Sequence, residues 1–169
     1  YTLHTLFPYT TLFRSDPEII KILGGFQNYS ADCCSDMLKL AAQNTHCGAD
    51  MVELVLDSYP NVPIEEIYEG FILSSVSNHL CGKYILSMLI KRGWKIPVDL
   101  NIISVLSGNM SSGADILKCL LSQGYTDLDA SIFEAATSGW ASDVMEALLD
   151  YQPHFQFNVD ILPPTCGGA

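Results

Sequence analysis

The chain has 169 residues, of which 49% are apolar, and a formal net charge of −11 at pH 7. This length and apolar content suit one domain with a buried core or a short repeat array, and they argue against a disordered chain. The acidic charge argues against nucleic acid and anionic membrane as partners, because both would be repelled.

Signals for membrane insertion or secretion are weak throughout the sequence. The longest continuous apolar candidate, "GFILSSV" at residues 70–76, falls far short of the ~20 residues of a membrane-spanning helix. The start lacks the basic beginning, apolar middle and small-residue cleavage site of a secretory signal. The six cysteines form no Cys-x-x-Cys pair, so we expect reduced thiols in a cytoplasmic protein.

The opening residues, 1–15, do not fit the rest of the chain. The stretch "HTLFPYTTLFRS" is rich in strand-forming residues, but it has no clean alternation and nothing after it reads as a partner strand. Residues 5–15 resemble the conceptual translation of a common sequencing-library adapter, and the chain has no initiating Met. We therefore interpret residues 1–15 as a non-native segment and exclude them from functional reasoning.

From residue 16 onward the sequence predicts a repeat of two helices joined by a short turn. The stretches "QNTHCGADMVELVL" (43–56), "SNHLCGKYILSMLI" (77–90) and "GNMSSGADILKCLL" (108–121) share an Asn, a Gly four residues later and an apolar helical run. A fourth copy, "SGWASDVMEALL" (138–149), is shortened, and "SDPEIIKIL" (15–23) predicts the second helix of an incomplete first unit. Short apolar first helices are predicted at 35–43, 69–77, 101–108 and 131–138, with starts marked at 62–64, 96–98, 128–130 and 157–159.

The turn between the two helices has a physical rationale in the sequence. Asn and Gly tolerate the left-handed conformation that ends a helix, and an Asp can accept hydrogen bonds from the free amides that open the next one. Gly93-Trp94 and Gly124-Tyr125 are predicted to end the second helices. The predicted structural turn residues are Asn44, Gly48, Asp50, Asn78, Gly82, Asn109, Gly113, Asp115 and Asp143.

These features resemble ankyrin repeats. Residues 16–23 look like the second helix of one, the unit length is near 33, and residues 41–56 are similar to the degenerate ankyrin-like arrays at the C-terminal end of fungal NACHT-type signalling proteins. The resemblance covers residues 16–162 and implies an all-α solenoid of about four units, the first incomplete, with residues 163–169 as a truncated or irregular tail. No unit has the Thr-Pro-Leu-His stretch of standard ankyrin repeats, so a generic helical-hairpin solenoid stays an alternative.

Side chains with possible chemistry are sparse, and we predict no catalytic residue, cofactor or metal site. His46, Cys47, His79 and Cys81 fall in neighbouring turns, but they form no tight ligand pair of the kind that zinc sites use. Cys33 or Cys34 with His46 is the one candidate nucleophile and base, and no motif supplies an orienting carboxylate. A small thiol enzyme is therefore only the third interpretation.

The first interpretation is a protein-binding scaffold that is a fragment of a larger protein. Its mechanism is recognition by stacked loops and first-helix faces, and its acidic surface favours a basic or mixed-charge protein over nucleic acid or membrane. The recurring loop aromatics Trp94, Tyr125 and Phe155 are the candidate partner-binding residues, with packing onto the preceding helix as the alternative. The second interpretation is the sensor or autoinhibitory C-terminal end of a signalling NTPase whose catalytic domain is missing.

Overall fold

A computed structural model of the chain describes residues 31–59, 64–125, 128–139 and 142–153. The regular elements in these ranges are all helices: α3 (Ala31–Gln43), α4 (Gly48–Ser58), α5 (Ile64–Ser77), α6 (Gly82–Lys91), α7 (Leu100–Gly108), α8 (Gly113–Leu121), α9 (Ala130–Thr137) and α10 (Ser142–Tyr151). The predicted all-α fold class is confirmed for this part of the chain. The segment 1–15, the predicted helix at 16–23, the start at 157–159 and the tail 163–169 lie outside the described residues.

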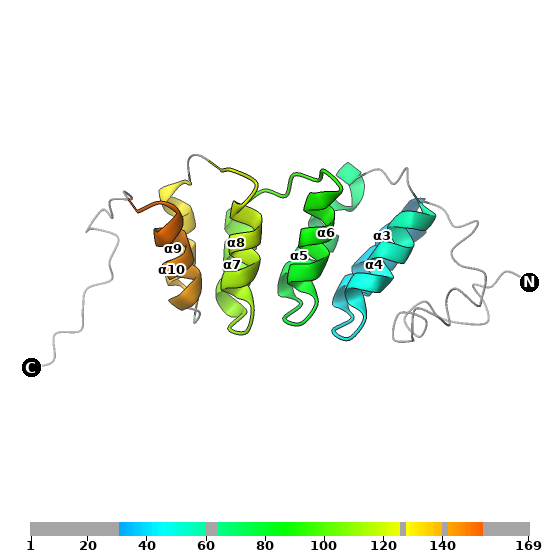
Figure 1. The fold of residues 1–169 in the computed structure, drawn as a ribbon, viewed down its shortest axis with the longest axis horizontal. Helices are drawn as coiled ribbons and strands as arrows, with labels where there is room; N and C mark the ends of the chain where they lie inside the picture. Colours follow the sequence, from blue (N-terminus) through cyan, green and yellow to red (C-terminus); the bar gives the residue numbers. More distant parts are fainter. Residues whose placement is uncertain (1–30, 60–63, 126–127, 140–141, 154–169) are drawn as a thin grey trace, which may run out of the picture.

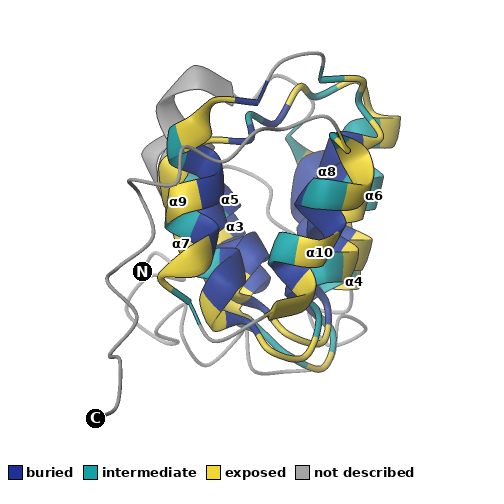
Figure 2. Cartoon of the chain, turned by 90° about the vertical axis from the view of Figure 1, so that its left-hand side faces the viewer, coloured by how far each residue is buried: buried dark blue, intermediate teal, exposed yellow. Residues whose placement is uncertain are grey.

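The helices pair into four hairpins, α3/α4, α5/α6, α7/α8 and α9/α10, which we call the first to the fourth. The hairpins stand side by side in a row, with the short turns between paired helices along one edge (Figure 1). Each first helix contacts the first helix of the next hairpin, and each second helix contacts the next second helix. Figure 2, viewed along the row, shows these two layers facing each other with their buried sides inward.

The core follows from the apolar positions that recur in each hairpin. In α8, Ile116, Leu117 and Leu120 are fully buried, and α4 and α6 bury the residues at the same distance from their first turn. In α10, Val144 and Leu148 are buried at the equivalent positions, whereas Met145 is partly buried. Each such side chain contributes about 1.5–3 kcal/mol when it is removed from water. Because every hairpin leaves an apolar face toward its neighbours, the buried residues form one continuous core rather than four.

The glycines at the start of the second helices are needed for close packing. We expected a left-handed conformation there, but among the described glycines only Gly93 and Gly124 have a positive φ, of 88° and 83°. A Cβ added at Gly82 would lie 2.3 Å from the carbonyl oxygen of Ser75, and one at Gly113 would lie 2.4 Å from that of Leu106. The left-handed prediction is therefore wrong for Gly82 and Gly113. Glycine is needed at these positions because the absence of a side chain lets the two helices of a hairpin approach closely.

Replacing Gly82 with Ala is therefore expected to destabilise the array by about 2–3 kcal/mol, because the new methyl group meets backbone that has no room to move. Thermal or urea unfolding followed by circular dichroism measures the change. Gly70→Ala is the matched control, since Gly70 lies in a helix, is exposed, and has only the flexible end of Lys39 near its added Cβ, at 3.8 Å. That control is expected to gain about 0.5–1 kcal/mol, and equal losses in both variants would contradict the close-approach explanation.

The second helices end where the sequence predicts. At the end of α6 the amide of Gly93 donates to Ile90 O and that of Trp94 donates to Leu89 O, at 2.9 and 3.1 Å. This is the pair of hydrogen bonds of a Schellman motif, in which a residue with positive φ satisfies the last carbonyls of the helix. Gly124 ends α8 with a similar bond from its amide to Leu121 O. The role of both glycines in turning the chain is confirmed.

The first helices α7 and α9 begin at aspartates. Asp99 Oδ1 accepts a hydrogen bond from the Ile102 amide at 2.9 Å, and Asp129 Oδ1 accepts one from the Ser131 amide at 3.2 Å. The predicted cap at Asp129 is confirmed. The predicted start at residues 96–98 is wrong, because α7 begins at Leu100 and Asp99, rather than Pro97, satisfies its free amides.

The acids near the start of the second helices act differently from our prediction. Asp50, Asp115 and Asp143 lie inside the first turn of α4, α8 and α10, so they do not occupy the capping position. Cys47 and Ser112 stand at that position in α4 and α8 and make no side-chain cap hydrogen bond. Carboxylates in a first turn still favour the helix, because they interact with the partial positive charge of its N-terminus.

Candidate functional site

The turns at residues 44–47, 78–81 and 109–112 form a row that we call the turn edge. Asn78 shows how this row is built. Its side-chain oxygen accepts hydrogen bonds from the amides of Leu80 and Cys81, at 3.1 and 2.8 Å, and so closes its own turn. Its side-chain nitrogen donates to Ala42 O and Asn44 O of the first hairpin, at 2.7 and 2.9 Å. One buried amide therefore shapes a turn and joins two hairpins.

The same arrangement recurs in the third hairpin. Asn109 accepts from the Ser112 amide at 3.2 Å and donates to Val76 O of the second hairpin, also at 3.2 Å. In the first hairpin, Asn44 accepts from the amides of His46 and Cys47. The asparagines predicted as structural turn residues therefore lie in the turns, and the bond to the preceding hairpin is a function that the sequence pattern did not reveal.

The fourth hairpin uses a backbone contact in place of an asparagine. A Cβ added at Gly139 would lie 2.1 Å from Ser107 Cβ and 2.6 Å from Ser107 O, so this glycine packs directly on α7. Residues 140 and 141 of this turn lie outside the described residues, so the shortening predicted from the sequence stays a prediction. The asparagine junctions thus connect hairpins one to three, and a glycine contact connects the fourth.

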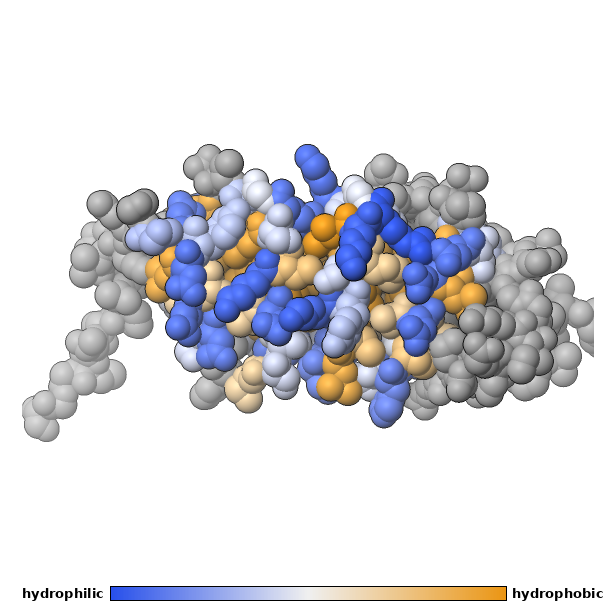
Figure 3. All heavy atoms as spheres, in the orientation of Figure 1, coloured by the Kyte–Doolittle hydropathy of each residue, from blue (hydrophilic) through white to orange (hydrophobic). Residues whose placement is uncertain are grey.

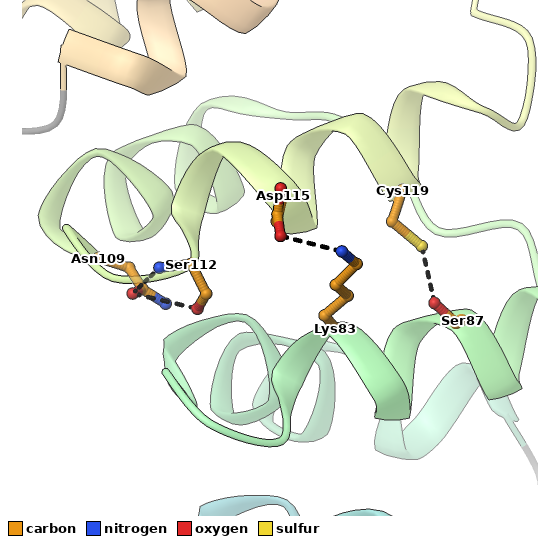
Figure 4. A network of polar contacts seen from close by, with 6 residues as sticks. All are labelled: Lys83, Ser87, Asn109, Ser112, Asp115 and Cys119. Atoms are coloured by element: carbon orange, nitrogen blue, oxygen red, sulfur yellow. Dashed lines mark hydrogen bonds and ion pairs between the residues drawn. The ribbon is translucent and has the colours of Figure 1, made fainter.

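Second-helix side chains add polar contacts across the stack (Figure 4). Lys83 Nζ in α6 lies 2.9 Å from Asp115 Oδ2 in α8, and one turn farther along Ser87 Oγ lies 3.2 Å from Cys119 Sγ. The hydrogen bond and charge of Lys83 lower the pKa of Asp115, and Asp115 raises the pKa of Lys83 in the same way. Both side chains are exposed, so the pair sets the position of the two groups more than it stabilises the fold.

The loop aromatics Trp94 and Tyr125 are partly buried against their own array. The Trp94 ring meets Phe71 of α5 edge to face, with centroids 6.2 Å apart. The Tyr125 hydroxyl donates a hydrogen bond to Ile96 O in the preceding connection. Phe155, the third aromatic of the predicted partner-binding set, lies outside the described residues. The two described rings thus serve packing, and their role in binding a partner stays a prediction.

A pair of glutamines at the ends of α8 and α10 was missed in the sequence. Gln123 accepts a hydrogen bond from the Ile96 amide at 3.0 Å and donates to Ile96 O at 3.1 Å, which closes the third hairpin. Gln152 accepts from the Leu128 amide at 3.4 Å in the fourth hairpin. The sequence signal that could have identified them is their position, because both glutamines lie within two residues of a second-helix end. A polar residue in a loop does not by itself indicate a structural hydrogen bond.

Tyr125 makes the stability of the array depend on pH in the alkaline range. Burial, followed by the charges of Asp99 and Tyr151, raises the pKa of Tyr125. The protonated form is therefore favoured in the folded state, so its contribution to stability is complete below the ordinary tyrosine pKa of ~10 and is lost as pH rises through the folded-state pKa.

Tyr125→Phe is expected to lose about 1 kcal/mol at pH 8, where the hydroxyl donates to Ile96 O, and to close this gap as pH rises above ~10 through the folded-state pKa of Tyr125. Urea unfolding at a series of pH values measures both effects. Tyr84→Phe, at an exposed tyrosine on α6, serves as the control and should follow the wild-type curve. A constant difference between Tyr125→Phe and wild type across this range would contradict the assignment.

The thiols and imidazoles that suggested chemistry are dispersed. Cys34 is buried in the core, whereas His46 is exposed in the first turn, and nothing is described of the Cys33 side chain. Cys81 and Cys119 are free thiols, and Cys81 donates a hydrogen bond to Thr45 O. Across the described ranges, no group of three or more His, Cys, Asp or Glu side chains is placed to hold a metal ion.

Comparison with known proteins gives no match. No protein-family model, no curated protein and no solved structure is significantly similar to this chain. The described helices also include none that is both long and apolar enough to cross a membrane.

Proposed function

We propose that this chain is an ankyrin-like repeat array that acts as a scaffold for binding another protein. The paired helices, the unit length near 33 residues and the row of equivalent turns support the ankyrin-like type. A stack of this kind carries equivalent positions of successive units side by side, which suits recognition of an extended protein surface.

The observation that carries the proposal is the contrast between a repeated frame and a varied surface. The frame repeats Asn78 as Asn109, Gly82 as Gly113, and the buried apolar positions of each second helix. Exposed turn positions differ between units, since the place of Leu80 in the second turn is His46 in the first and Ser111 in the third. Variation at exposed positions is the pattern expected of a binding surface on a constant support.

The described polar groups also favour binding over catalysis. Cys34 lies in the core, Asp115 is paired with Lys83, and the buried asparagines and the glutamines hold backbone groups. We further propose a cytoplasmic location, which the free thiols of Cys81 and Cys119 support. The net charge of −11 favours a partner with basic or mixed charge.

The test is to isolate interacting proteins from the source cells with the tagged full chain and then to rebuild each complex from purified components. We expect at least one protein to bind saturably, with a defined stoichiometry and a Kd tighter than ~10 μM by calorimetry. A folded array that binds none of the purified candidates would overturn the scaffold proposal. Turnover of a substrate that depends on Cys34 would instead support an enzyme.

A further inference from the structure

Three large apolar side chains on or next to the turn edge are the most exposed of the large hydrophobic residues whose burial the structure describes. Met110 is 72% exposed, Tyr84 67% and Leu80 55%. Leu80 and Tyr84 belong to the turn and first helical turn of the second hairpin, and Met110 belongs to the turn of the third. In Figure 3 apolar spheres stand among hydrophilic ones along the lower edge, where these turns lie.

The fold does not require apolar residues at these positions. The place of Leu80 is taken by His46 in the first turn and by Ser111 in the third. The place of Met110 is taken by Thr45 and His79, and the place of Tyr84 by Asp50 and Asp115. Since the same turn forms with polar residues in the neighbouring hairpins, packing does not account for the three apolar side chains.

The three side chains lie on two neighbouring hairpins. Asn109 of the third hairpin donates to Val76 O of the second, and Lys83 is paired with Asp115 across the same two hairpins. These contacts hold the second and third turns next to each other, as the adjacent turns in Figure 1 show. We call the set Leu80, Tyr84 and Met110 the apolar turn patch.

Acidic residues flank the apolar turn patch. Asp50 in the first hairpin and Asp143 in the fourth are exposed, and neither has an ion-pair partner among the described residues. Lys83, the basic side chain in the first turn of α6, is paired with Asp115. A second copy of this chain would bring the same carboxylates and a net charge of −11 against them, so the surface is unfavourable for self-association.

We infer that the apolar turn patch binds a basic amphipathic segment of a partner protein. Apolar side chains of that segment cover Leu80, Tyr84 and Met110, and its lysines or arginines face Asp50 and Asp143. This inference rests on the proposed scaffold function and specifies which edge of the array is used and which chemistry recognises it.

The test uses a synthetic 18-residue helical peptide with leucines on one face and lysines on the other as the probe. Calorimetry at low and at physiological salt measures its affinity for the full chain and for Leu80→Ser/Tyr84→Ser/Met110→Ser. We expect this triple variant to bind at least about tenfold more weakly.

Asp50→Asn/Asp143→Asn is expected to bind the peptide more weakly at low salt and to lose most of the salt dependence of the affinity. Leu100→Ser, at a 49% exposed leucine outside the patch, is the matched control and should bind within about twofold of wild type.

Several outcomes would overturn the inference. Equal affinity of wild type and the triple variant would remove the patch from binding, and equal affinity for a peptide with glutamates in place of lysines would remove the charge argument. Dimerisation of the free chain that the triple variant abolishes would make a second copy the occupant. Binding to neutral phosphatidylcholine vesicles that depends on the patch would make it a lipid surface. A purified partner from the scaffold experiment that binds the folded triple variant normally would leave the scaffold function intact and refute this site alone.

Discussion

Replacing Leu120 with Asp is expected to unfold the array or to cost more than about 5 kcal/mol. Leu120 in α8 is fully buried in the core that α8 shares with its neighbours. The substitution removes an apolar side chain, which alone costs ~2–5 kcal/mol, and places a carboxylate where no charge partner is available. Since the stability of a domain is typically 5–15 kcal/mol, one such change removes most of it.

Loss of the helical circular dichroism signal, or a large fall in the urea midpoint, measures the effect. Lys118→Asp is the control, because Lys118 lies on the same helix but is exposed, and it is expected to change stability by less than ~1 kcal/mol. Unchanged melting of Leu120→Asp would show that the proposed position of α8 in the stack is wrong.

The second large effect is expected at Asn78. Asn78→Ala removes two hydrogen bonds to the first hairpin and two that close the turn, and it leaves the carbonyls of Ala42 and Asn44 without this donor. Because the side chain is buried, water does not replace these bonds, and we expect a loss of about 3–4 kcal/mol. Urea unfolding gives the free energy, and hydrogen exchange of residues 44–47 reports whether the first hairpin opens.

Asn101→Ala provides the comparison, because Asn101 is an exposed asparagine in α7. It should change stability by less than ~0.5 kcal/mol. Asn109→Ala is expected to lie between the two, since one longer bond of 3.2 Å joins its side chain to the second hairpin. A loss below ~1 kcal/mol for Asn78→Ala would show that the junction depends on apolar packing alone.

The helices and their order were accessible from the sequence because they follow from local pattern. The period of apolar residues predicted each described second helix, and Gly93 and Gly124 marked the ends of α6 and α8 correctly. The helices predicted at 16–23 and beyond 157 fall outside the described residues, so those predictions stay untested.

The parts of the candidate site that were missed depend on tertiary contacts. The sequence around Gly82 is compatible with a left-handed turn and with close helix packing. Two structural facts distinguish them: Gly82 is not among the glycines with positive φ, and a Cβ added to it would lie 2.3 Å from Ser75 O. The side-chain nitrogen of Asn78 donates to carbonyls of residues 34 and 36 positions earlier in the chain, and no local pattern encodes contacts over this separation. The apolar turn patch became visible only when exposure separated Leu80, Tyr84 and Met110 from the core residues beside them.

The direction of the asparagine bonds has a consequence for how such a chain changes its length. In each junction the donor belongs to the later hairpin, and the acceptors are main-chain carbonyls of the earlier one. Since every amino acid supplies a carbonyl, an additional hairpin brings its own connector and needs no matching side chain in the unit that receives it. Gene duplication can therefore add a hairpin without any change to the side chains that its asparagine bonds meet in the preceding unit.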